Sequence, residues 1–279
     1  MKKIIVTHIF PDLDAIASLW LLIRFHPDFD ETELAFVPAG ATYKGEPADS
    51  DPTVIHVDTG MGRFDHHQLA DKTAATELVF NYLKQEKLVT AKHQPALERL
   101  VKLVVALDNF DDCFWPEAAA DRYDLGLPEI INNLKISGKL NDKELAYQGM
   151  ILLDAVLTGL MIKIQVELTI KAGESFTSRW GKTLAVETKH SLVSKLAQKL
   201  GFSLVIKKEP KTGFVSVKSQ PKAELDLQPL YLRLKQADPA ASWFFHQSRH
   251  IIVNGSRHNP LVKASGLSLQ EIVDLVKQV

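Results

Sequence analysis

The residues best suited to chemistry in this 279-residue chain are aspartates and histidines that follow apolar segments. A first group runs from His8 to Asp14, after a short β-branched run, and Asp58 ends a second apolar run. In open α/β sheets, ligands bind at the carboxyl ends of the strands, so loops leaving these strands can converge there. Asp12-x-Asp14 alone would more often be a turn or a helix cap, and the pair His66-His67 alone would more often be surface or core histidines. Their combination favours a metal site, because an aspartate that ends a buried strand needs a partner.

Carboxylates and imidazoles in this number suit two divalent cations. An oxygen-rich set without a thiolate favours Mn²⁺ over Fe²⁺, Co²⁺ or Zn²⁺. Two cations about 3.5–4 Å apart can share a carboxylate, make a water more acidic for attack on phosphorus and neutralise charge on the phosphoryl oxygens. The candidate residues are His8, Asp12, Asp14 and Asp58, then Asp65, His66 and His67, and finally Asp108.

These residues resemble the motifs of the DHH phosphoesterase superfamily. It includes manganese-dependent inorganic pyrophosphatases, single-strand exonucleases and phosphodiesterases that act on nanoRNA or cyclic dinucleotides. The similarity covers residues 3–112. The similar segments are, in order, His8-x-x-Pro11-Asp12-x-Asp14-Ala15, Asp58, the signature Asp65-His66-His67, Ala74-Ala75-Thr76 and Asp108.

The resemblance implies a role for each matched residue. His67 would contact substrate or orient a ligand, and Asp65 would lie behind the ligands as an acceptor for a ring N–H. In the fourth motif, Asp111 and Asp112 are alternatives to Asp108. The implied ligands are His8, Asp12 and Asp58 for the first metal, and Asp14, Asp58, His66 and Asp108 for the second, with Asp58 bridging.

The C-terminal part departs from the superfamily's pattern. Many members carry a glycine-rich GGGH-type loop there, whereas this chain reads NGSRHNP over residues 254–260. Arg257, His258 and Lys263 suit a phosphate and are predicted to bind the substrate. The alternative is a surface turn with scattered basic residues.

The elements that must position these residues indicate an α/β fold. Continuous apolar runs are typical of strands in a parallel sheet, and helical spacing follows them. We predict an N-terminal parallel-sheet metal-binding domain with flanking helices over residues 1–180, and a smaller substrate-binding α/β domain over residues 181–279. The expected strands lie at 3–7, 34–40, 53–60, 184–188, 203–208, 214–219 and 250–255, and the main helices at 15–25, 74–85, 96–107, 127–172 around a loop capped by Asn141 or Asp142, 191–201, 229–236 and 268–278.

Composition narrows the class of protein. Hydrophobic residues make up 46% and charged residues 24%, an ordinary globular balance, and a net charge of -1 gives no overall basic field for nucleic acid. The single Cys113 excludes an intrachain disulfide and fits a reducing compartment. The apolar stretch 150–170 is interrupted by charges, which favours a buried core helix over a membrane span. We therefore expect a cytoplasmic protein without a membrane partner.

The sequence thus predicts a metal-dependent phosphoric ester hydrolase. Its substrate would be a phosphorylated small molecule or a short single-stranded nucleic acid, with a small nucleotide or short oligonucleotide preferred. The alternative is a metal- and nucleotide-binding sensor or interaction module with the same fold and no turnover. The oligomeric state, including a homodimer, stays open.

Overall fold

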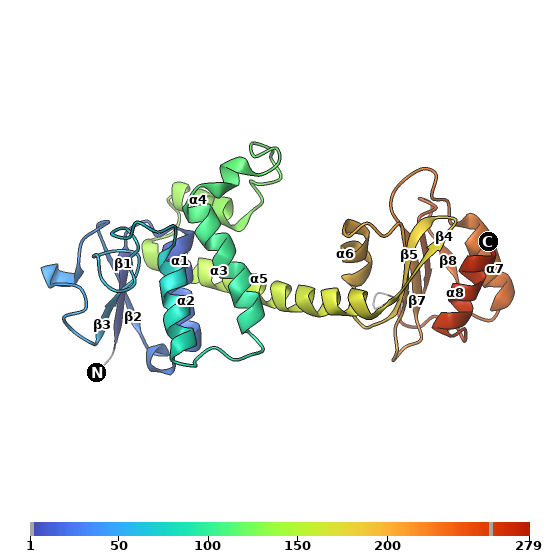
Figure 1. Ribbon diagram of the computed structural model, residues 1–279, viewed down its shortest axis with the longest axis horizontal. Coiled ribbons are helices and arrows are strands. Elements are labelled where there is room, and N and C mark those ends of the chain that lie inside the picture. The colour runs from blue at the N-terminus through green and yellow to red at the C-terminus, as the bar shows by residue number, and fades with distance from the viewer. Residues whose placement is uncertain (1–2, 257–258) are drawn as a thin grey trace. The chain divides into compact units, whose positions relative to one another are not determined.

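The computed structural model describes residues 3–256 and 259–279 and divides into two compact units, Met1–Met161 and Ile162–Val279 (Figure 1). The α/β class is confirmed. The elements are β1 (Ile4–His8), α1 (Leu13–Phe25), β2 (Glu33–Val37), β3 (Val54–His56), α2 (Ala75–Gln85), α3 (Gln94–Asp108), α4 (Leu127–Ile136), α5 (Asp142–Ala172), β4 (Glu174–Ser178), β5 (Gly181–Glu187), α6 (Val193–Lys199), β6 (Leu204–Lys208), β7 (Val215–Ser219), α7 (Gln228–Ala237), β8 (Phe244–Phe245), β9 (Ile251–Asn254) and α8 (Leu269–Gln278).

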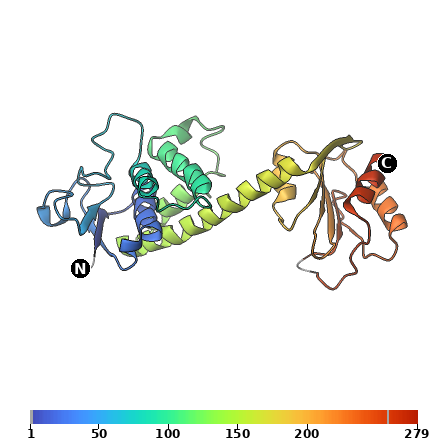
Figure 2. The same cartoon turned by 60° about the horizontal axis from the view of Figure 1, so that its bottom comes forward.

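The sheet of the first unit is parallel and has the order β2-β1-β3. Helices α1 and α2 lie on the same side of it (Figures 1 and 2). Strand β1 is central, and its Val6 pairs with His56 of β3. Two residues beyond this pair lie His8 and Asp58. The register of the two strands alone therefore brings this histidine and this aspartate to the same edge of the sheet.

Helix α5 extends through the contact boundary of the two units. Val166 and Ile170 in its last turns pack in a hydrophobic cluster of the second unit, so the boundary falls inside the helix and not near residue 180. By length and composition the helix could cross a membrane, and 28% of its most apolar window is buried. Leu153 and Leu157 are buried while Ile151 is exposed. The expected core helix is therefore buried on one face only.

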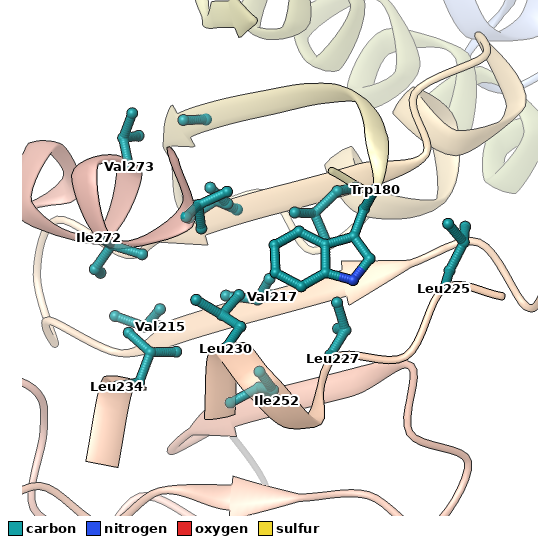
Figure 3. Packing of buried hydrophobic residues seen from close by; sticks show 14 residues of the cluster. Trp180, Val215, Val217, Leu225, Leu227, Leu230, Leu234, Ile252, Ile272 and Val273 are labelled. Atoms are coloured by element: carbon teal, nitrogen blue, oxygen red, sulfur yellow. The ribbon is translucent and has the colours of Figure 1, made fainter. Parts of the chain in front are cut away.

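The second unit contains a six-stranded mixed sheet in the order β4-β5-β6-β7-β9-β8. Helices α7 and α8 cover one face through a core that includes Trp180, Leu230 and Ile272 (Figure 3). Helix α6 and the end of α5 supply the cluster on the other face. The predicted hairpin is present as the antiparallel pair β6–β7, and Ser268 and Glu271 form the predicted capping box of α8.

Candidate metal centre

The six predicted ligands converge at the carboxyl edge of the first unit's sheet. Asp58 lies at their centre: its Oδ2 is 3.2 Å from His8 Nε2 and its Oδ1 is 3.4 Å from His66 Nε2. Asp58 also groups with His66 and His67. The other two groups, within each of which the ligand atoms lie within 4.8 Å of one another, are His8 with Asp12 and Asp58, and Asp14 with His66 and Asp108.

In the group of His8, Asp12 and Asp58, His8 ends strand β1 and Asp12 caps helix α1. The Asp12 side chain accepts a hydrogen bond from Ala15 N at 3.0 Å, which fixes the carboxylate beside the strand end. His8 Nδ1 lies 2.9 Å from Ile9 O and must donate to it, because a carbonyl oxygen only accepts. The Nε2 of a neutral ring therefore directs a lone pair at the Asp58 carboxylate, and a cation is needed between them.

A proton supplies that cation when no metal is bound. Burial disfavours the charged form of His8, but the hydrogen bond to Asp58 and the charges of Asp12 and Asp58 outweigh it and raise the pKa of His8 to about 9. Burial would raise the pKa of Asp58, yet its contacts with His66 and His8 hold it below the ordinary value. The pair is thus electrostatically prepared to bind positive charge.

In the group of Asp14, His66 and Asp108, the Nε2 atom of His66 faces three carboxylates from three different segments. His66 Nε2 lies 3.4 Å from Asp58, 3.6 Å from Asp108 and 3.7 Å from Asp14. These distances are long for hydrogen bonds. They approach the spacing of about 3.0–3.4 Å between neighbouring ligands on a cation with bonds of about 2.1 Å.

Asp14 is held by the start of helix α2. Its two carboxylate oxygens accept hydrogen bonds from Ala75 N and Thr76 N, both at 2.8 Å. Ala74, at the N-cap position of that helix, provides no side-chain hydrogen bond, so Asp14 supplies the missing acceptor. Burial and the charge of Asp58 nevertheless raise the pKa of Asp14 above its ordinary range. A metal would relieve this unfavourable buried charge.

Among the three acidic candidates of the fourth motif, the structure brings Asp108 into the cluster. It ends helix α3, and burial raises its pKa to about 6, against the opposing charge of His66. Asp111 forms an ion pair with Lys72 instead. Asp112 lines a neighbouring cavity.

Asp58 gives the clearest indication that a metal fits these residues. Its Oδ1 is buried and, among the residues that the structure describes, has no hydrogen-bond partner. A buried carboxylate oxygen without a hydrogen bond is costly, and a bound cation would satisfy it. Asp58 also adopts a left-handed backbone conformation with φ of 53°, rare for a non-glycine residue.

Asp65 and His67 lie beside the cluster as a pair. The Asp65 side chain is buried; its Oδ2 accepts from Met61 N at 2.7 Å and its Oδ1 from His67 Nδ1 at 2.7 Å. Asp65 thus fixes the loop and the ring of His67 and is not among the grouped ligands. The His67 side chain is 57% exposed and lines a cavity of about 350 Å³ together with His8 and Asp58.

The predicted substrate-binding residues are only partly visible. Arg257 and His258 lie outside the described residues, and the Lys263 backbone oxygen accepts from Asn254 Nδ2 at 2.9 Å.

Sequence reasoning missed a cavity of about 530 Å³ in the second unit. Its lining includes Lys189, Lys207 and Lys218 together with Gly255 and Ser256. The β6–β7 register places Lys207 and Lys218 on the same face, so strand alternation was the available signal.

Comparisons with known proteins give only weakly similar solved structures. No family model and no curated protein matches the chain. One similar solved structure is an uncharacterized protein from Helicobacter pylori G27, with 14% identity and a TM-score of 0.30; the match covers 100% of this chain and 99% of that one. Another is the DHH domain of a member of the S1p family of ribosomal proteins, with 14% identity and a TM-score of 0.33; the match covers 99% of this chain and 86% of that one. A third is RecJ from Thermus thermophilus in complex with Mg²⁺, with 12% identity and a TM-score of 0.32; the match covers 99% of this chain and 49% of that one. The chain spans about half of RecJ. TM-scores this low carry no weight for function, which must be argued from the chain's own residues.

Proposed function

We propose that the chain is a two-metal phosphoesterase of the DHH type that hydrolyses a phosphodiester or phosphoanhydride, with a small nucleotide or short oligonucleotide as substrate. The position of Asp58 carries this proposal. One of its oxygens faces His8 and the other, buried without a hydrogen bond among the described residues, faces His66. A carboxylate placed in this way between two ligand groups is suited to bridge two cations.

The two groups correspond to two metal positions. His8, Asp12 and Asp58 would hold the first cation, and Asp14, His66 and Asp108 the second, with Asp58 shared. When bound, the divalent cations, for which the oxygen-rich donors favour Mn²⁺, would make a water more acidic and neutralise charge on the phosphoryl oxygens.

Protein groups would position the substrate and move a proton. His67 Nδ1 donates to Asp65, so in the protonated ring Nε2 would carry the proton that passes to the leaving oxygen in the adjoining cavity. Lys135 of helix α4 lines a second cavity together with Asp12 and Asp108, where it would attract a phosphate. In the second unit, the three-lysine cavity is suited to bind an anionic group.

The first test is the metal content of the purified chain, followed by Mn²⁺-dependent hydrolysis of an aryl phosphodiester, a short oligonucleotide and pyrophosphate. About two metals per chain with product release is the expected result. Two metals without turnover on any of the three would instead favour the sensor or interaction module. A chain that binds no metal would overturn both functions.

A further inference from the structure

An apolar cavity of about 300 Å³ lies beside the metal centre in the first unit. Its walls come from helices α3, α4 and α5 and from the segment that joins α3 to α4. A second cavity, also of about 300 Å³, is lined by the cluster residues Asp12, Asp14 and Asp108. The two cavities lie side by side, because both are lined by Leu13, Val104, Leu107, Pro128 and Glu129. A ligand with one end at the cluster could therefore extend into the apolar cavity.

The wall of the apolar cavity suits a flat ring. Leucine side chains such as Leu100, Leu103 and Leu127 make up much of the lining. Trp115 and Tyr123 add two aromatic rings, with centroids 5.6 Å apart and planes tilted by 47°. Aromatic side chains offer a stacking surface that accepts any nucleobase.

Polar groups in the lining distinguish the two ends of the groove. Asp112, Asp124 and Glu129 line the apolar cavity, and no ion pair or side-chain hydrogen bond involves their carboxylates within residues 3–256 and 259–279. Carboxylates accept hydrogen bonds and repel phosphate. Lys135 lines only the cavity next to the cluster. When cations neutralise the carboxylates of the cluster, an anionic group is thus favoured at the cluster end, and a group with N–H donors at the far end.

We propose that this groove between α3 and α4 is the nucleobase subsite of the enzyme and binds an amine-bearing base whose phosphate lies at the metal centre. The proposal rests on the proposed function for the phosphate end alone. Stacking and apolar contact would come from Trp115, Tyr123 and the leucines. The carboxylates of Asp112, Asp124 and Glu129 would accept hydrogen bonds from the amino and ring N–H groups.

The test compares two ligands that differ only in the base. Adenosine 5′-monophosphate and ribose 5-phosphate are titrated calorimetrically into the full chain loaded with Mn²⁺. We expect the nucleotide to bind about tenfold tighter, from the stacking of one base. Equal affinities, or failure of the nucleotide to bind the metal-loaded chain, would overturn the subsite.

Two neighbouring alanines provide matched variants. Ala118 is exposed and lines the apolar cavity, whereas Ala119 is exposed and does not line it. Ala118→Trp should fill the cavity and abolish the preference for the nucleotide while leaving ribose 5-phosphate binding unchanged. Ala119→Trp should keep the preference. Trp115→Ala, which empties part of the wall without adding bulk, should also weaken nucleotide binding alone. A preference that survives both Ala118→Trp and Trp115→Ala would contradict the assignment.

The outcomes separate this subsite from the catalytic proposal. Hydrolysis of the aryl phosphodiester together with equal binding of the two ligands would reject the subsite and keep the hydrolase. A nucleotide preference that Ala118→Trp abolishes, in a metal-loaded chain with no turnover, would keep the subsite and reject the hydrolase.

Discussion

Replacing Asp58 by asparagine should remove metal binding with little change in shape. The carboxylate lies 3.2 Å from His8 Nε2 and 3.4 Å from His66 Nε2. One unit charge at that separation contributes about 5 kcal/mol at an effective dielectric constant near 20. A neutral amide would lose this attraction for a cation on either side, so we expect metal affinity to fall by about three to four powers of ten.

Thermal unfolding measures this loss without requiring a substrate. Metal at about one hundred times its Kd stabilises a folded chain by about 2.7 kcal/mol, which corresponds to an increase in Tm of about 5–10 °C for a domain of this size. The native chain should show this increase with Mn²⁺, and Asp58→Asn should not. Asp111→Asn is the matched control, because that carboxylate pairs with Lys72 outside the cluster. A Mn²⁺-induced increase in Asp58→Asn equal to that of the control would refute the bridging role.

Three further predictions concern proton linkage and substrate positioning. Asp65→Asn should lower kcat by about 10–100-fold with both metals retained, because Asp65 orients the His67 ring; loss of metal on elemental analysis would contradict this positioning role. The pKa values of His8 and His66 are raised to about 9 and that of Asp14 to about 8, so bound metals must displace their protons. Calorimetric Mn²⁺ affinity should therefore fall by about tenfold or more per pH unit as the pH falls below about 8, and an affinity independent of pH would exclude this linkage. Lys135→Ala should raise KM for an oligonucleotide with kcat unchanged, whereas exposed Lys139→Ala should leave both unchanged; equal KM values in the two variants would remove Lys135 from substrate binding.

The parts of the fold that the sequence predicted well are those with strong local signals. Continuous apolar runs identified the three parallel strands, and Ser268 with Glu271 marked the start of α8. Of the two predicted caps, Asn141 and Asp142, it is Asn141 that caps α5, by exchanging hydrogen bonds with Glu144. The loop before α5 covers residues 137–141, because that cap starts the helix at Asp142.

Strand β4 was missed because its stability comes from its partner. Glu174–Ser178 is polar and mostly exposed, with no apolar alternation that would indicate a strand. It forms because its backbone pairs with β5, as in the pairing of Phe176 with Thr183. Such pairing between chain segments leaves no local pattern, and strand propensity depends on this context.

In the candidate site, too, some contacts could be predicted from the sequence and others depend on tertiary packing. The order and spacing of His8, Asp58 and His66 were sufficient to predict that they meet, since strand ends in a parallel sheet share an edge. The amides that hold Asp14 and the loop contacts of Asp65 depend on tertiary packing. No pattern in the sequence predicts these contacts.

The hydrogen bonds from helix α2 to Asp14 make the helix start a reporter of metal occupancy. A bound cation would keep the Asp14 carboxylate ionised, and an ionised acceptor strengthens the hydrogen bonds from Ala75 N and Thr76 N. In the metal-free chain, the raised pKa of Asp14 favours the neutral acid and weaker bonds. Hydrogen–deuterium exchange at these two amides should therefore slow when metal binds, which would allow loading to be followed at the backbone of a chain whose substrate is still unidentified.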